Sequence, residues 1–262
     1  METVLPPGAA ELLGRARRVV VFTGAGISAE SGVPTFRDDL TGLWARFDAE
    51  QLATPEAFFA DPELVWGWYE WRRARVRRAQ PNAGHLAVAA IEDLIPGTVV
   101  ITQNVDDLHE RAGSRAPVHL HGSLFAPRCV TESAHPADFP TTTGEEVADD
   151  EGGRIAPPRC VRCGALVRPG VVWFGEALPG AALTAAVEAA SACDVLLTIG
   201  TSGLVYPAAE IPHIAAHSGA TVMQINPQPT PLDEISAVNL RGSAAQILPT
   251  LVRAAWEFAG KP

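Results

Sequence analysis

Short apolar runs rich in β-branched residues recur along the chain, and each of them ends in glycine or polar residues. The runs cover residues 18–23, 98–102, 195–199 and 221–225, and stretches rich in alanine, leucine and glutamate lie between them. Short buried strands that alternate with helices are typical of a parallel sheet with helices on both faces. The pattern therefore predicts an α/β fold in which these four runs form the sheet.

Two segments interrupt this alternation. Residues 36–80 have the pattern of helices, for example over 62–78, whereas 126–168 hold three cysteines, several prolines and an acidic stretch. We expect both to be insertions that build a smaller domain, one part helical and the other cysteine-containing and zinc-ribbon-like. The remaining segments are expected to form a doubly wound, Rossmann-like domain, and they comprise residues 1–35, 81–125 and 169–262.

Composition narrows the classes of partner. The net charge of −10 disfavours nucleic acid, because a protein that binds the phosphate backbone normally presents a basic face. No apolar run approaches the roughly 20 residues that a membrane-spanning helix needs, and the first residues do not follow the pattern of a signal peptide. We therefore expect a cytoplasmic protein without a membrane partner, and the oligomeric state stays open.

A glycine-rich turn follows the first apolar run. Residues 24–29 read Gly-Ala-Gly-Ile-Ser-Ala, which is the dinucleotide-binding pattern with alanine in the last place. Gly24 would permit a tight turn, and Gly26 would let backbone N–H groups approach a pyrophosphate at a helix N-terminus. The acidic residue that dehydrogenases carry about 20 residues further on is not evident, since Asp38 and Asp39 lie in a polar loop. This argues against an ordinary dehydrogenase.

The glycine motif continues as Glu-Ser-Gly-Val-Pro-Thr-Phe-Arg up to residue 37, and here the chain resembles the sirtuin family. Four further segments agree with that family in the same order, and they are 102–109 (Thr-Gln-Asn-Val-Asp-Asp-Leu-His), 119–122 (His-Leu-His-Gly), 200–202 (Gly-Thr-Ser) and Asn226. The resemblance spans nearly the whole chain, from Val19 to about Val252. One such motif could arise by chance, but five collinear motifs indicate a common family.

The resemblance implies an NAD-dependent protein-lysine deacylase. Such an enzyme removes acyl groups from lysine side chains of proteins or peptides and yields nicotinamide and 2′-O-acyl-ADP-ribose. Mono-ADP-ribosyl transfer to protein is the alternative, because it uses the same activated ribose. An ordinary NAD dehydrogenase ranks third, and a non-enzymatic binding protein built on a zinc module ranks fourth.

Three polar residues after the second apolar run are the first candidates for contact with NAD. Gln103, Asn104 and Asp106 follow a strand at its carboxyl end, where open α/β sheets bind ligands. Their amide and carboxylate groups suit ribose hydroxyls and a carboxamide, although such residues also serve the backbone in turns. The resemblance also implies that Phe36 lies on a mobile loop over the nicotinamide. The further NAD-binding residues that it implies are Gly24, Ala25, Gly26, Ser28, Phe36, Arg37, Gly200, Thr201, Ser202, Asn226 and Ala244.

Two histidines frame a short strand-like segment. Alternate residues of a strand face the same side, so His119 and His121 can share a face. The resemblance selects His121, which precedes a glycine, as the catalytic base, and it adds Asn104 to the catalytic residues. An unperturbed imidazole has a pKa of about 6.5, which suits a general base at neutral pH. His119 and His109 are expected to be structural.

Three of the four cysteines fall within one 35-residue window. In a cytosolic chain this clustering favours a metal over a disulfide. Cys160 and Cys163 form one Cys-x-x-Cys half of a zinc site, but the first half reads Cys129-Val-Thr-Glu132 where most relatives have a second cysteine pair. Structural zinc normally takes four ligands, so Glu132 or His135 would complete the set or the site would be degenerate. The alternative is that the cysteines simply pack.

A tyrosine and an arginine in the helical insertion indicate which acyl group the enzyme removes. Tyr69 and Arg72 lie three residues apart and therefore share a helix face. Arginine can bind a carboxylate bidentately, and tyrosine can donate a further hydrogen bond. In sirtuins of the desuccinylase type such a pair reads the acyl carboxylate, and the resemblance adds Ala53 as a small residue that leaves room. Removal of succinyl or malonyl as well as acetyl groups follows. The alternative is a solvated basic face, because Arg73 and Arg75 are also charged.

Segments 171–176 and 203–206 look extended. The resemblance implies that substrate peptide pairs with both by strand addition, which places Val172 and Phe174 among the substrate-binding residues. Ordinary strands of the sheet are the alternative.

Overall fold

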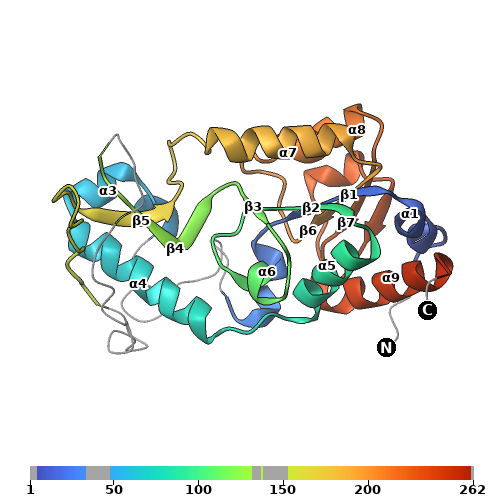
Figure 1. The fold of residues 1–262 in the computed structure, drawn as a ribbon, viewed down its shortest axis with the longest axis horizontal. Coiled ribbons are helices and arrows are strands. Elements are labelled where there is room, and N and C mark those ends of the chain that lie inside the picture. Colours follow the sequence, from blue (N-terminus) through green and yellow to red (C-terminus); the bar gives the residue numbers. More distant parts are fainter. Residues whose placement is uncertain (1–4, 34–47, 132–136, 138–152, 261–262) are drawn as a thin grey trace.

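A six-stranded, fully parallel sheet forms the larger part of the molecule in the computed structural model, which describes residues 5–33, 48–131, 137 and 153–260 (Figure 1). Its strands lie in the order β3-β2-β1-β6-β7-β8. Their bounds are β1 Arg18–Thr23, β2 Gly97–Thr102, β3 Val118–His119, β6 Val195–Ile199, β7 Thr221–Ile225 and β8 Val238–Leu240. The crossovers place helices on both faces, so the expected Rossmann-like α/β architecture is confirmed.

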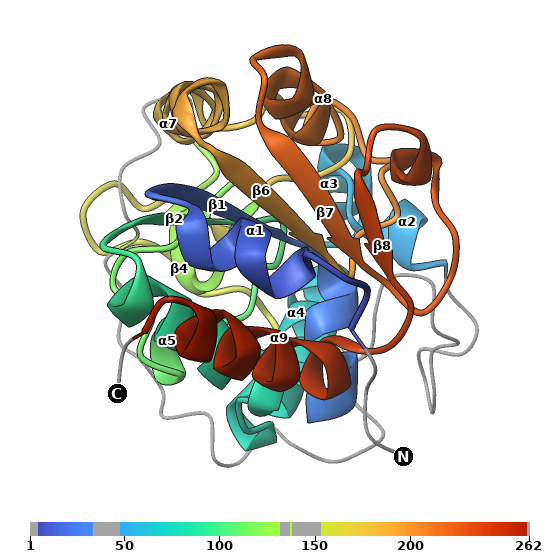
Figure 2. The same cartoon turned by 90° about the vertical axis from the view of Figure 1, so that its right-hand side faces the viewer.

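Alternation along the central strand supplies both halves of the core. Val19 and Val21 of β1 pack with α1 (Ala9–Arg15), α5 (Ala83–Leu94) and α9 (Ala244–Phe258). Val20 and Phe22 face the other side, where α7 (Gly180–Ala192) and α8 (Glu210–His217) cover the sheet. Figure 2 shows these two helical layers with the sheet between them.

The smaller lobe lies beyond the carboxyl ends of the central strands, at the left of Figure 1. It contains an antiparallel pair of strands, β4 (Gly122–Cys129) and β5 (Val167–Val171). Its helices are α2 (Ala49–Leu52), α3 (Pro55–Ala60) and α4 (Pro62–Arg78). Aromatic residues dominate its core, and they include Phe58, Trp68, Tyr69, Trp71 and Trp173.

The predicted strands and the predicted helix over 62–78 are all present. The division into three segments stays a prediction, and β4 and β5 run across the boundaries expected after residues 125 and 168. A short helix, α6 (Leu108–Arg111), and the 3₁₀ turns Ala25–Ile27, Ala29–Ser31 and Pro231–Glu234 complete the described elements. Within the described ranges, no helix combines the length and the apolar character that crossing a bilayer requires.

Candidate active site

The polar residues singled out in the sequence converge at one edge of the sheet. Residues 24–28 follow β1, 103–106 follow β2, 200–202 follow β6 and Asn226 follows β7. Because all these strands are parallel, their carboxyl ends open on the same side, towards the smaller lobe. Phe36 and Arg37 lie outside the described residues.

The glycine turn packs directly onto the end of β6. The Gly26 N–H donates to the carbonyl oxygen of Gly200 over 2.8 Å. A Cβ at Gly26 would lie 2.7 Å from Gly200 Cα, and one at Gly24 would lie 2.8 Å from Thr201 Cβ. Gly24 itself is extended, with φ −124° and ψ −175°. Glycine is therefore required at residue 24 by this close approach, not by the tight turn that its sequence predicts.

Ser28 is the centre of a buried hydrogen-bond network. Its hydroxyl donates to Asp106 Oδ2 over 2.9 Å and accepts from the Asn104 side-chain amide over 3.1 Å. His85 Nε2 lies 3.3 Å from the same oxygen. Since the Asn82 backbone N–H donates to His85 Nδ1, the proton of the neutral ring sits on Nε2 and points at Ser28. The serine hydroxyl thus has three partners, which fix its orientation from three sides.

His85 and His109 belong to this site although they were not expected to act in it. Asn82 caps α5, and His85 is the third helical residue, whose Nδ1 accepts from the Asn82 backbone N–H in a capping box. His109 Nε2 lies 3.0 Å from Thr23 Oγ1 at the end of β1. Burial lowers the pKa of His85 to about 4 and that of His109 to about 3. Both rings are therefore neutral, and an N-cap asparagine followed three residues later by histidine is the signal that could have revealed His85.

His121 and His119 both turn towards the loop that follows β2. His121 Nδ1 lies 2.9 Å from the Gln103 carbonyl oxygen, to which it donates, and Nε2 is left for other contacts. Burial lowers the pKa of His121, although this hydrogen bond partly opposes the effect. His119 differs because Asn104 and Glu110 engage its two nitrogens. Burial acts to lower its pKa, but the Glu110 carboxylate, the Asn104 carbonyl oxygen and Asp106 together outweigh burial, so the pKa is raised. The two rings have different protonation chemistry.

Thr201 joins the loops that follow β2, β6 and β7. The Gln103 side-chain amide donates to Thr201 Oγ1, and the Asn226 amide donates to the Thr201 carbonyl oxygen, both over 2.8 Å. Ala244 begins α9 and lies against Gly84 of α5, while Glu30 accepts from the next backbone N–H. The expected NAD-binding residues that the structure describes therefore surround one edge of the sheet.

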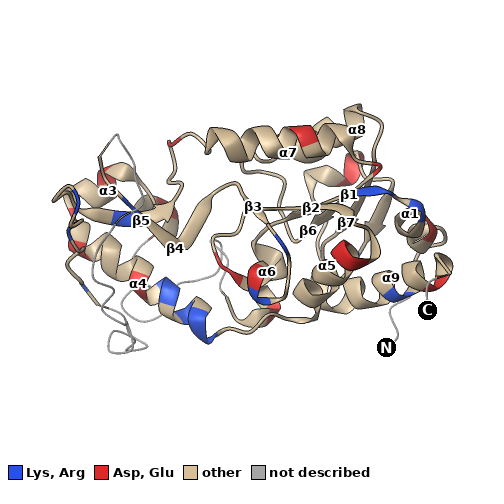
Figure 3. Cartoon of the chain, viewed as in Figure 1, with Lys and Arg blue, Asp and Glu red and all other residues tan. Residues whose placement is uncertain are grey.

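Tyr69 and Arg72 are buried, so this face of α4 is not a solvated basic surface. Tyr69 is 1% exposed and Arg72 is 7% exposed. Burial lowers the pKa of Arg72, whereas Tyr69 and the Asp106 carboxylate act to raise it. The guanidinium is thus electrostatically coupled to Asp106, which follows β2 at the carboxyl edge of the sheet. Basic residues that do collect at the C-terminal end of α4 (Figure 3) are Arg75, Arg77 and Arg78.

The segment after β5 is hydrogen-bonded to both His121 and Ala53. The Val172 N–H donates to the His121 carbonyl oxygen over 2.8 Å, and the Phe174 N–H donates to the Ala53 carbonyl oxygen over 2.9 Å. Ala53 is buried and Phe174 is half exposed. Neither 172–174 nor 203–206 is a regular strand in this structure, contrary to their extended appearance in the sequence. Leu204, Val205 and Tyr206 are nevertheless exposed beside this edge.

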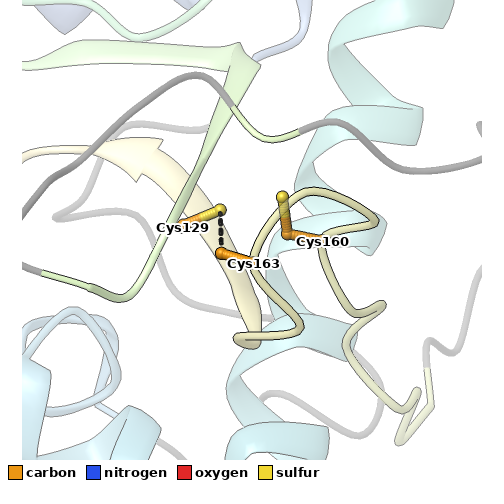
Figure 4. Close-up of side chains that lie close together, drawn as sticks. All are labelled: Cys129, Cys160 and Cys163. Carbon is orange, nitrogen blue, oxygen red and sulfur yellow. Dashed lines mark hydrogen bonds between the residues drawn. The ribbon is translucent and has the colours of Figure 1, made fainter.

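Cys129, Cys160 and Cys163 form a compact cluster in the smaller lobe (Figure 4). Their sulfur atoms all lie within 4.8 Å of one another. Cys160 and Cys163 sit in a tight turn that the Gly164 N–H closes onto the Cys160 carbonyl oxygen over 2.7 Å. Sulfurs about 2.3 Å from one tetrahedral zinc ion are roughly 4 Å apart, so this donor set fits zinc. Glu132 and His135, the expected fourth ligands, lie outside the described residues, whereas Cys193 packs in the core.

Comparison with known proteins places these observations in a family. Residues 24–207 match the model of the Sir2 family. The chain is 58% identical over 246 residues to NAD-dependent protein deacylase 1 of Pseudomonas aeruginosa, with 94% of this chain and 97% of that protein covered. It is also similar to a solved Sir2 homologue in complex with NAD, at a TM-score of 0.86 and 42% identity, over 98% of this chain and 96% of that one. A Sir2 enzyme bound to a myristoylated histone peptide aligns at a TM-score of 0.76 and 36% identity, over 96% of each chain.

Proposed function

The chain belongs to the Sir2 family and is an NAD-dependent protein-lysine deacylase, and we propose that it favours acyl chains that end in a carboxylate, such as succinyl and malonyl, while also removing acetyl groups. Its substrates are then proteins or peptides acylated on lysine. A cytoplasmic location is part of the same proposal.

The placement of Arg72 is the observation that supports this acyl preference. The guanidinium is buried next to Tyr69, and the Asp106 carboxylate at the carboxyl edge of the sheet acts to raise its pKa. Burial disfavours the charged guanidinium, and a carboxylate entering between Arg72 and Tyr69 would offset that cost. Ala53 is buried at the end of α2 and adds little side-chain volume to this region. A charged acyl end is therefore the ligand whose chemistry matches these groups.

The residues around the sheet edge suit NAD. When bound, NAD supplies the activated ribose that accepts the acyl group. The glycine turn would bring backbone N–H groups to the pyrophosphate, and the Gln103, Asn104 and Asp106 side chains offer amides and a carboxylate to the nicotinamide ribose and carboxamide. The remaining contacts are proposed for Ala25, Ser28, Phe36, Arg37, Gly200, Thr201, Ser202, Asn226 and Ala244.

We assign the role of general base to His121. Its Nδ1–H is held by the Gln103 carbonyl oxygen, so the lone pair of the neutral ring is on Nε2. Because burial lowers the His121 pKa, the ring is unprotonated at neutral pH and can accept a proton from a ribose hydroxyl. Asn104 assists by position, since its amide is tied to Ser28 within the same network.

The peptide and metal sites complete the proposal. Val172 and Phe174 lie between His121 and Ala53, which suits contact with the peptide around the acylated lysine. Cys129, Cys160 and Cys163 would hold one structural zinc ion that stabilises the smaller lobe.

A panel of modified peptides tests the acyl preference. Peptides of one sequence that carry acetyl-, malonyl-, succinyl-, glutaryl- or a long fatty-acyl-lysine are incubated with NAD, and products are measured by mass spectrometry. We expect nicotinamide release with every accepted peptide and higher kcat/KM for malonyl and succinyl than for acetyl. Faster turnover of acetyl or fatty-acyl peptides would contradict the preference. Label from radioactive NAD that stays on protein would instead support ADP-ribosyl transfer.

A further inference from the structure

The tyrosine of the proposed acyl pocket is already hydrogen-bonded from one side. The Trp173 indole Nε1–H donates to the Tyr69 hydroxyl oxygen over 3.0 Å. An indole nitrogen can only donate, so the direction of this bond is unambiguous. The Tyr69 oxygen is therefore the acceptor, and its own proton must point away from Trp173.

Trp173 is held in place by several contacts. Its backbone N–H donates to Glu176 Oε2 over 2.9 Å, and Arg168 Nη2 donates to the same oxygen over 2.9 Å. The Arg168 guanidinium carbon lies 3.4 Å from the centre of the Trp173 ring, and the Phe58 ring packs at 5.3 Å. Trp173 is 2% exposed. The indole thus has little freedom to turn away from Tyr69.

The consequence concerns the proton of Tyr69. Burial raises the pKa of this phenol, so it stays protonated at every working pH. With its oxygen already accepting from Trp173, the hydroxyl is oriented so that it offers its hydrogen, rather than its oxygen, to an acyl group. Arg72 has no acceptor atom at all. The two polar groups proposed to meet the acyl end are therefore both donors.

We infer that Trp173 is a positioning residue that makes this pocket select acyl chains ending in a hydrogen-bond acceptor and discriminate against a neutral amide end of the same shape. A carboxylate accepts from both Tyr69 and Arg72. A primary amide has one accepting oxygen, and its NH₂ group would face a donor and stay unsatisfied. The inference rests on the proposed acyl preference, to which it adds the residue that orients the phenol.

The test compares two peptides that differ only in the acyl end. Succinyl-lysine carries a carboxylate, and succinamyl-lysine carries the isosteric primary amide. In Trp173→Phe the aromatic ring stays and the donor is lost, so Tyr69 can rotate and accept. We expect the ratio of kcat/KM for succinyl over succinamyl to fall about two- to tenfold, the effect of one neutral hydrogen bond. The KM for the succinyl peptide should rise more than the KM for the acetyl peptide.

A double variant separates positioning from general damage. In the Tyr69→Phe background, Trp173→Phe should lower the ratio no further, because the two residues act through one hydrogen bond. Trp71→Phe, in the same aromatic core but packed beneath Arg75, should leave the ratio unchanged. Suppose that the wild-type enzyme prefers succinyl and that Tyr69→Phe loses this preference. An unchanged ratio in Trp173→Phe would then overturn the inference about Trp173 and leave the proposed acyl preference standing. A wild-type enzyme without succinyl preference would overturn the proposed function as well.

A spectroscopic measurement does not depend on the stability of Trp173→Phe. With isotope-labelled tryptophan, the Trp173 indole N–H resonance reports its hydrogen bond in the intact protein. Tyr69→Phe should move this resonance towards the position of an indole without an acceptor. A resonance that does not move would show that Trp173 does not hold the tyrosine oxygen, and this would contradict the inference.

Discussion

The Nδ1–H of His121 donates to the carbonyl oxygen of Gln103 over 2.9 Å, and this bond determines which ring nitrogen is free for chemistry. Gln103 is also tied to Thr201 through its side chain. Gln103 therefore fixes His121 and the loop after β6 relative to each other. The same strand end thus positions both the proposed proton acceptor and the proposed NAD contacts.

Replacing His121 should remove the base without unfolding the protein. In His121→Asn we expect kcat/KM to fall on the order of 10²–10⁴-fold, as for the loss of a general base. Nicotinamide release with an acyl-lysine peptide measures the effect, and circular dichroism checks the fold. His119→Asn serves as the comparison and should lose less, because Glu110 and Asn104 engage both nitrogens of that ring. Near-normal turnover in a folded His121→Asn protein would refute the assignment.

The buried pair His85 and His109 should make the protein acid-labile. In the unfolded chain both rings bind protons near pH 6.5, but in the folded protein their pKa values are lowered to about 4 and about 3. At a pH between the folded and the unfolded pKa values, the unfolded state binds more protons than the folded state. The free energy of unfolding should therefore fall as pH falls below about 6.5. Each pKa unit corresponds to about 1.4 kcal/mol.

Denaturant unfolding at a series of pH values between about 7 and 4 measures this dependence. His109→Leu should have a shallower slope than the wild-type protein, since one depressed pKa is removed. His217→Gln, on the exposed end of α8, should keep the wild-type slope. Identical slopes for wild type and His109→Leu would contradict the prediction.

Gly26→Ala should detach the glycine turn from β6. The added Cβ would lie 2.7 Å from both Gly200 Cα and the Gly200 carbonyl oxygen, and neither backbone atom can swing aside. Overpacking of this kind typically costs about 1–3 kcal/mol. NAD should raise the wild-type Tm and raise that of the variant much less, because the pyrophosphate site is displaced. Ala29→Ser, at an exposed position of the next turn, should respond to NAD normally, and a full Tm shift in Gly26→Ala would count against the proposed pyrophosphate site.

One zinc ion per chain is expected in protein purified without added metal. Cys163→Ser should release it and lower the Tm, since the energy of metal binding contributes to folding. Because the Cys163 side chain is exposed, lost packing would not explain such a decrease. Cys193→Ala, in the core beside β6, should retain the metal. Zinc retained by Cys163→Ser, or more than one tightly bound zinc, would show that the cluster is assigned incorrectly.

Local patterns in the sequence predicted four of the six strands of the sheet, and the family resemblance supplied most of the candidate site positions. The four β-branched runs form strands because each is buried on both faces, and their carboxyl ends carry the polar residues of the site. Periodicity also placed helix α4, where Asp61 caps the N-terminus and Pro62 begins the first turn.

Contacts between distant segments could not be predicted in this way. Trp173 meets Tyr69 across 104 positions of the chain, and the glycine turn meets Gly200 in the loop after β6. Arg72 is buried, whereas Arg77 and Arg78 further along the same helix are exposed. This difference depends on which parts of the chain pack against each face of α4. Residue spacing alone could not separate the buried arginine from the solvated ones.

The most direct test of the account is Arg72→Met, assayed with acetyl- and succinyl-lysine peptides of one sequence. A hydrogen bond to a charged group is worth roughly 1.5–3 kcal/mol, so we expect desuccinylation to lose about ten- to a hundredfold in kcat/KM, mainly through KM. Deacetylation should change little. Arg75→Met, one turn further along α4 and packed over Trp71, should retain both activities. Equal losses on the two peptides for a folded Arg72→Met protein would contradict the carboxylate-reading role and leave a plain deacetylase.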